Sequence, residues 1–176
     1  KVDPARAKAF FQRVETLRTG TGEMQVQDVA ILDTDGNPTD TVPFEDDLRI
    51  RIHYTYTHAM DDPVDLGIGI TDSRGVEIMH HSLATVNRDA REIGVGEVGV
   101  VVLSSRNFLC PGEFAINVGA NTLVSHPTLS GQKLVGQVID YCVGCARFSI
   151  RQPHVRGSMN VWGIVRSEFD VTIDRT

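Results

Sequence analysis

Aromatic residues and cysteines are scarce in this chain of 176 residues. The aromatic residues make up 6% of the sequence and include a single tryptophan, Trp162. The three cysteines, Cys110, Cys142 and Cys145, are an odd number, which argues against a disulfide framework and suits a reducing cytoplasm. The fold must therefore rest on an ordinary apolar core, and the chain is long enough to bury one.

Positive charge is also in deficit, because 17 Lys and Arg face 23 Asp and Glu, for a formal net charge of -6. No block of basic residues stands out, so nucleic acid is not an expected partner. No apolar run approaches the roughly 20 residues that span a bilayer, and no signal segment precedes the rest. We predict a soluble protein, and its first residue, Lys1, suggests a piece of a longer chain.

The motifs of the common enzyme classes are missing too. The sequence has no GxxxxGK[ST] phosphate loop, no GxSxG elbow and no HExxH site. The CVGC pair at 142–145 is half of a zinc site without a second half, so we interpret it as small residues of a strand. DTDGN at 33–37 begins like a calcium loop, but its twelfth position is Phe44, which favours a turn. We predict no catalytic residues, no metal and no cofactor.

Short strands separated by turn residues are what the sequence has in abundance. We predict one helix over 4–17, with a proline in its first turn. The predicted strands lie near 24–33, 46–57, 65–72, 76–84, 96–104, 113–121 and 144–151. Many short strands with little helix predict an all-β fold, an immunoglobulin-like or jelly-roll β-sandwich with a short N-terminal helix.

The stretch LRIRIHYTY at 48–56 alternates with period two. Its apolar side, which we predict to lie in the core, is made of Leu48, Ile50, Ile52, Tyr54 and Tyr56. Its polar side, which we predict to be exposed on a sheet face, is made of Arg49, Arg51, His53 and Thr55. Such a face either pairs its charges with neighbouring strands in solvent or binds a polar ligand.

Six features occur in a fixed order along the chain. They are GTGE at 20–23, the DTDGN turn, LRIRIHY at 48–54, PVDLGIGITDSRG at 63–75, PGEF at 111–114 and RFSI at 147–150. Together they resemble the C-terminal carbohydrate-binding domain of the ATP-binding subunit of bacterial O-antigen polysaccharide exporters, the Wzt type. The resemblance covers most of residues 19–151, and the departure from the family pattern lies at 122–137.

The resemblance implies a domain that recognises the O-antigen polysaccharide, a lipid-linked glycan, for export by an ABC transporter. It would be the substrate-specificity domain of an ABC-type ATPase, cytoplasmic and peripheral to the inner membrane, with the membrane-spanning exporter subunit as a partner. The side chains that we expect to bind carbohydrate are Arg49, Arg51, His53, Thr55 and Asn117. The arginine fork would suit a phosphate or a carboxylate on the glycan. The alternative is a dimeric adaptor or assembly domain that binds a protein partner.

The resemblance also implies a homodimer that forms by strand exchange. In the family the segment after the RFSI-like strand crosses to a second subunit, and here that segment is 158–174. Pro153 and Gly157 precede it and favour a break in the sheet. The residues predicted to lie in the dimer interface are Met159, Val161, Trp162, Ile164, Phe169, Val171 and Ile173.

These expectations divide the chain into three parts. Residues 1–22 are the helix and a linker from a preceding domain, and 23–152 are the carbohydrate-binding β-sandwich. Residues 153–176 are a second linker and the exchanged C-terminal strands.

Overall fold

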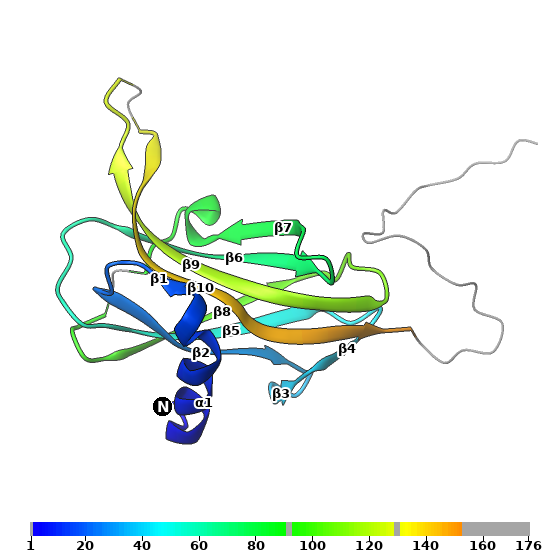
Figure 1. Cartoon of the computed structure of the whole chain (residues 1–176). Coiled ribbons are helices and arrows are strands. Elements are labelled where there is room, and N and C mark those ends of the chain that lie inside the picture. Colours follow the sequence, from blue (N-terminus) through cyan, green and yellow to red (C-terminus); the bar gives the residue numbers. More distant parts are fainter. Residues whose placement is uncertain (1, 91–92, 129–130, 153–176) are drawn as a thin grey trace, which may run out of the picture.

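Two β-sheets packed face to face form the body of the molecule in a computed structural model, which describes residues 2–90, 93–128 and 131–152 (Figure 1). The predicted all-β sandwich is therefore confirmed. The predicted interface residues of 158–174 and the linker before them lie outside the described residues. No helix in the described ranges has the length and apolar character needed to cross a bilayer.

The helix α1 (Pro4–Val14) lies beside the sandwich next to β2 and β10. Asp3 caps it, because its side chain accepts a hydrogen bond from the Ala5 amide at 2.9 Å. Phe10 and Val14 are four residues apart, so they share one face of the helix, and both are fully buried in the core. A 3-10 turn, Glu15–Leu17, then leads into the first strand.

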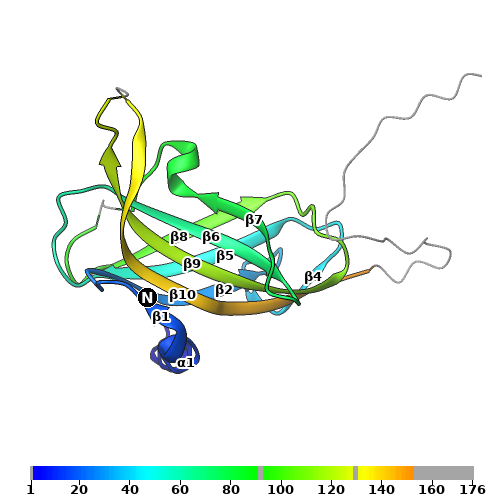
Figure 2. The ribbon, with the colours of Figure 1, turned by 45° about the horizontal axis from the view of Figure 1, so that its top comes forward.

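The larger sheet, sheet A, has the strand order β1-β10-β9-β6-β7, and β4 pairs with β10 in parallel. Its strands are β1 (Arg18–Thr19), β4 (Thr41–Pro43), β6 (Val64–Asp72), β7 (Glu77–Ser82), β9 (Gly112–Ser125) and β10 (Lys133–Arg151). A 3-10 helix, η2 (Leu83–Val86), follows β7. The hairpin of β9 and β10 extends beyond the rest of the sandwich, in yellow at the top of Figures 1 and 2.

The smaller sheet, sheet B, has the order β3-β2-β5-β8, and its neighbours are antiparallel. Its strands are β2 (Met24–Leu32), β3 (Pro38–Thr39), β5 (Leu48–Tyr56) and β8 (Val98–Ser105). The turn at 33–37 joins β2 to β3, and the Asp33 carboxylate accepts hydrogen bonds from the Asp35 and Asn37 amides. DTDGN is thus a turn between strands, as the sequence predicts.

The last strand of sheet A begins earlier than predicted. We expected a strand near 144–151, whereas β10 starts at Lys133. Residues 133–138 are exposed on both sides of the projecting hairpin, so no alternation of buried and exposed residues marks the strand in the sequence.

The core lies between the two sheets and follows the predicted alternation of β5. All five apolar residues of that strand are buried, with exposed fractions of 5% or less. They face the inward residues of sheet A, which include Ile68 and Ile70 of β6 and Ile116 and Val118 of β9. The polar residues between them are left on the outer faces of the sandwich.

Candidate functional site

The residues predicted to bind carbohydrate do not form one site, because the fold places them on opposite sides of the sandwich. The four predicted residues of β5 alternate with core residues, so they lie on the outer face of sheet B. Asn117 lies between two buried residues of β9 and therefore on the outer face of sheet A. The whole core separates the two faces.

On sheet B, some of the predicted polar side chains already form hydrogen bonds with other residues of the protein. Arg49 donates a hydrogen bond to the Thr34 carbonyl oxygen at 3.2 Å. Thr55 donates one to the Glu97 carbonyl oxygen at 2.8 Å. Arg51 is half-buried, and its Nε has no hydrogen-bond partner among the residues described.

The prediction that His53 is exposed is wrong, because its exposed fraction is 7%. His53 lies opposite Asp28 of β2, and its Nδ1 is 3.8 Å from the Asp28 carboxylate. Burial lowers the pKa of His53, and the positive charge of Arg51 lowers it further, against the opposing effect of Asp28. His53 is thus a buried residue that packs beside Asp28, not an exposed side chain.

A β-bulge in the neighbouring strand explains the burial of His53. The bulge between Val26 and Asp28 turns the Asp28 carboxylate to the outer face of sheet B. Arg6 of α1 binds that carboxylate, with its Nη2 at 3.1 Å from Oδ2. Nothing within 48–56 indicates these neighbours, which come from β2 and from the helix.

A shallow groove of about 330 Å³ lies on the outer face of sheet A. Its floor consists of Gly67 and Gly69 of β6 and Gly119 of β9, and Gly67 lies directly opposite Gly119. Because glycine has no side chain, side chains of the neighbouring strands can come close to the backbone of these two strands. We call this feature the glycine groove.

Polar side chains from four strands surround the floor. They are Asp65 of β6, Glu77 and His80 of β7, Asn117 and Asn121 of β9, and Tyr141 of β10. The strand register brings them together: Asn121 lies opposite Asp65, Asn117 opposite Gly69, and Tyr141 opposite Gly119. Residues as far apart in the sequence as 65 and 141 thus line the same groove.

Two of the floor glycines make room for side chains of the rim. A Cβ built at Gly69 would collide with the carboxylate of Glu77. A Cβ built at Gly119 would lie 3.3 Å from the ring of Tyr141. Glu77 and Tyr141 therefore lie over the glycine floor, one from β7 and the other from β10.

Two side chains of the groove are more than nine-tenths buried and still keep an uncommitted polar end. Asn117, 9% exposed, accepts a hydrogen bond from the Gly144 amide at 2.9 Å through Oδ1, which leaves Nδ2 as a donor. Asp65, 8% exposed, accepts one from the Ala84 amide at 2.9 Å through Oδ1. Its Oδ2 has no hydrogen-bond partner within the described ranges, so each side chain can bind a ligand without giving up its structural contact.

A second hollow, of about 670 Å³, shares Asn117 with the glycine groove. Its lining includes Arg13 of α1, Arg147 of β10, Asp72 and Glu113. Another hollow shares Asp65 with the groove and is lined by Arg88, Asp89 and Lys133. Hollows of mixed charge therefore border the glycine groove at Asn117 and at Asp65, whereas no arginine or lysine is among the groove's own described lining residues.

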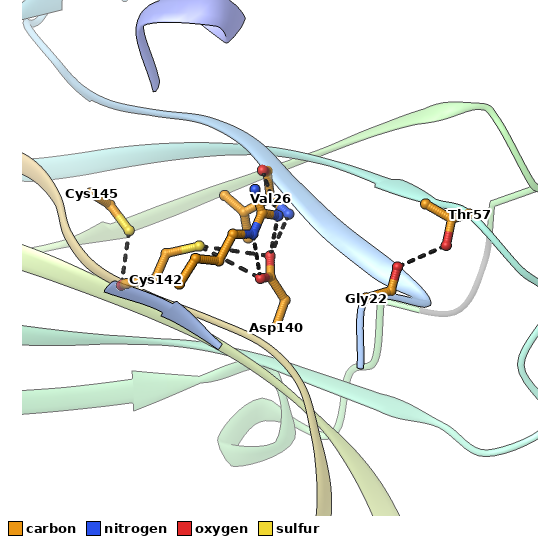
Figure 3. Close-up of polar contacts among 7 residues, drawn as sticks. Gly22, Val26, Thr57, Asp140, Cys142 and Cys145 are labelled. Carbon is orange, nitrogen blue, oxygen red and sulfur yellow. Dashed lines mark hydrogen bonds and ion pairs between the residues drawn. The ribbon is translucent and has the colours of Figure 1, made fainter. Parts of the chain in front are cut away.

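The CVGC pair lies inside β10, in the core. Cys142 and Cys145 are fully buried, and the Cys145 thiol donates to the Cys142 carbonyl oxygen at 3.0 Å (Figure 3). The contact with Cys145 and burial raise the pKa of the Cys142 thiol. A thiol that stays protonated is a poor nucleophile and a poor metal ligand, so the pair acts as small core residues.

The groove residues other than Asn117 were not predicted from the sequence, although two patterns point to them. In VDLGIGI at 64–70, inward Leu66 and Ile68 leave Asp65, Gly67 and Gly69 on the outer face. In NVGAN at 117–121, two asparagines and a glycine alternate with buried residues in the same way. Alternating glycines in a strand mark a close approach of backbone or ligand. Only the register shows that the two patterns lie side by side.

Comparison with known proteins identifies the family. The family model described as the Wzt C-terminal domain matches residues 15–166. The chain belongs to the Wzt C-terminal domain family. Among solved structures, the crystal structure of the C-terminal domain of wzt matches with a TM-score of 0.67 and 18% sequence identity, over 88% of this chain and 87% of that chain. A search of curated proteins found no match.

The family match confirms the resemblance found in the sequence, and the structural match confirms the fold. Membership makes this chain a domain of the Wzt-type ABC exporters. The Wzt C-terminal domain is non-catalytic, which agrees with the prediction that this chain is not an enzyme.

Proposed function

We propose that this Wzt C-terminal domain recognises the O-antigen polysaccharide of its ABC exporter and that the glycine groove is the binding site. The observation that carries the proposal is the pair of buried polar side chains, Asn117 and Asp65, which line the glycine groove and each keep one polar atom without a partner among the described residues. A few fixed polar groups at a concave surface are typical of small-molecule sites.

The chemistry of the groove suits a sugar ring. Each sugar hydroxyl both donates and accepts hydrogen bonds, and Asn117 supplies a donor where Asp65 supplies an acceptor. The ring of Tyr141, 37% exposed, offers an apolar surface for the C–H face of a pyranose and a hydroxyl for its edge.

The context of the proposal is the full transporter. As the specificity domain of a Wzt-type exporter, we propose, it acts on the cytoplasmic side, peripheral to the inner membrane. Its partners are then the polysaccharide, the membrane-spanning exporter subunit and a second copy of itself.

Calorimetric titration with the O-polysaccharide of the source organism tests the proposal. We expect Tyr141→Ala and Asn117→Ala each to weaken binding by about 1 to 3 kcal/mol, because each removes a contact that water replaces only in part. Arg51→Ala is the control on the other face, and it also tests the prediction for Arg49, Arg51, His53 and Thr55. If Arg51→Ala weakened glycan binding and Tyr141→Ala did not, the result would show that the binding site lies on sheet B.

The proposed homodimer has a candidate docking edge in β8. Among the residues that the structure describes, β8 pairs with β5 alone, so its other edge is open to a further strand. Val98, Val100 and Val102 line the outer face of this edge strand and are 44%, 51% and 52% exposed. Residues 158–174 of a second copy are apolar enough to cover the valines and long enough to pair along the strand.

The valine face of β8 also favours a second candidate function. In an adaptor or assembly domain this face would bind a different protein. An apolar edge strand is an ordinary site for the addition of a partner's strand. Glycan binding that depends on Tyr141 separates the two functions, because an adaptor has no use for the glycine groove.

A further inference from the structure

The charge of the glycine groove has one sign. Two carboxylates line it, Asp65 at one end and Glu77 over the floor. Within the described part of the chain, no lysine or arginine lines this groove. The arginines of β5 lie on the opposite face of the sandwich, and Arg13 and Arg147 lie in the neighbouring hollow. His80 also lines the groove, with Nδ1 3.6 Å from the Glu77 carboxylate, and Arg88 and Lys133 line a separate hollow that shares Asp65. A ligand in the groove therefore meets two carboxylates and no lysine or arginine among the described lining residues.

We infer that the glycine groove selects an uncharged sugar and rejects sugars that carry a phosphate, a sulfate or a carboxylate. This inference rests on the proposed function and names its substrate class. It replaces the expectation from the sequence that arginines would suit an anionic glycan, because the fold keeps β5 away from the groove.

Hydrogen-bond matching supports the same conclusion. An ionised carboxylate only accepts hydrogen bonds, so Asp65 and Glu77 require donors on the ligand. The hydroxyls of a neutral sugar supply such donors, and their oxygens accept from Nδ2 of Asn117. An anionic substituent at the same place offers acceptors alone and is repelled by both carboxylates.

Desolvation strengthens the selection at Asp65. This residue is 8% exposed, so water screens its charge less than it screens the exposed Glu77. Its Oδ1 accepts a hydrogen bond from the Ala84 amide at 2.9 Å, which favours one orientation of the carboxylate. Asp65 therefore contributes the part of the selectivity that added salt does not remove.

A matched pair of glycans tests the inference on the whole chain. The probes are oligosaccharides that contain uronic acid and the same oligosaccharides after chemical reduction of the carboxyl groups, printed on one array with common neutral hexose oligosaccharides. Binding is measured at pH 8, where histidine side chains in general carry no charge. We expect the neutral member of a recognised pair to bind at least roughly tenfold more tightly than the acidic member.

Charge-neutralising variants identify the source of the selectivity. Glu77→Gln and Asp65→Asn keep the shape of the groove, and each should raise binding of the acidic member severalfold relative to the neutral one. Arg51→Ala, on the far face, should leave the ratio unchanged. Tyr141→Ala should weaken both members of the pair together.

The outcomes separate the inference from the proposed function. Equal or tighter binding of the acidic member, abolished by Tyr141→Ala, overturns the neutral-sugar inference and leaves glycan recognition by the groove in place. Selectivity that survives both Glu77→Gln and Asp65→Asn also overturns it. Binding to no glycan, or binding insensitive to Tyr141→Ala, overturns the proposed function itself.

Discussion

The guanidinium of Arg18 binds both carboxylate oxygens of Asp140, with Nε and Nη2 each 2.7 Å from their acceptors. Asp140 also accepts a hydrogen bond from the Val26 amide at 2.8 Å, so this carboxylate connects β10 of sheet A to β2 of sheet B. Arg18 also donates a hydrogen bond to the Val26 carbonyl oxygen. The ion pair thus joins the two sheets beside the helix.

The first prediction concerns this ion pair. Asp140 is 2% exposed, so Arg18→Ala leaves a buried carboxylate without its countercharge. We expect the free energy of unfolding to fall by about 3 kcal/mol or more, measured by urea denaturation. Arg74→Ala is the matched control, because the side chain of Arg74 is 69% exposed in its pair with Asp72 and should contribute less than about 1 kcal/mol. Equal effects of the two variants would contradict the prediction.

The second prediction concerns the pH dependence of stability. The pKa of His53 is lowered in the folded protein, so the unfolded chain binds the proton more readily. The stabilisation that comes from neutral, buried His53 is therefore complete above the pKa of histidine in the unfolded chain, about 6.5. It is lost as the pH falls through the lower pKa of His53 in the folded protein. Between pH 7.5 and pH 5 the free energy of unfolding should fall less in His53→Gln than in the wild type. Urea denaturation of both proteins at several pH values measures this difference. Parallel curves for the two proteins would count against it.

The third prediction compares two glycines of the groove floor. An added Cβ at Gly69 meets the far end of the flexible Glu77 side chain, which can move away. An added Cβ at Gly67 meets the Ser82 Cβ at 2.9 Å and the backbone oxygen of His81 at 3.1 Å. Gly67→Ala should therefore cost about 1 to 3 kcal/mol of stability through overpacking, whereas Gly69→Ala should cost less than about 1 kcal/mol and mainly change glycan affinity.

Thermal denaturation and glycan titration of both glycine variants check this difference. Alanine is sterically acceptable at either backbone position, since neither glycine has a positive φ. A large loss of stability in Gly69→Ala would show that Glu77 has no room to move.

The fourth prediction concerns self-association. If residues 158–174 of a second copy cover the edge of β8, then Val100→Lys should shift the protein toward the monomer in sedimentation velocity. Val76→Lys is the matched control, because Val76 is also 51% exposed but lies in the turn between β6 and β7. Truncation after Gln152 should likewise abolish the dimer. A truncated chain that stays dimeric would rule out the exchange.

The sequence by itself determined the class of fold and much of its layout. Alternation at 48–56 placed five apolar residues in the core correctly, because the period of side chains along a strand is a local property of the backbone. Turn residues marked most strand ends for the same local reason. The family could be identified from the order of its motifs along the chain.

Only the tertiary structure decided which polar side chains share a surface. The burial of His53 depends on a bulge in β2 and on Arg6 from the helix, and neither lies within its own strand. The separation of Asn117 from the arginines of β5 follows from their placement in different sheets. Asp65, Asn117 and Tyr141 meet because β6, β9 and β10 pair in one register, and pairing between distant strands is a long-range contact that no local pattern encodes.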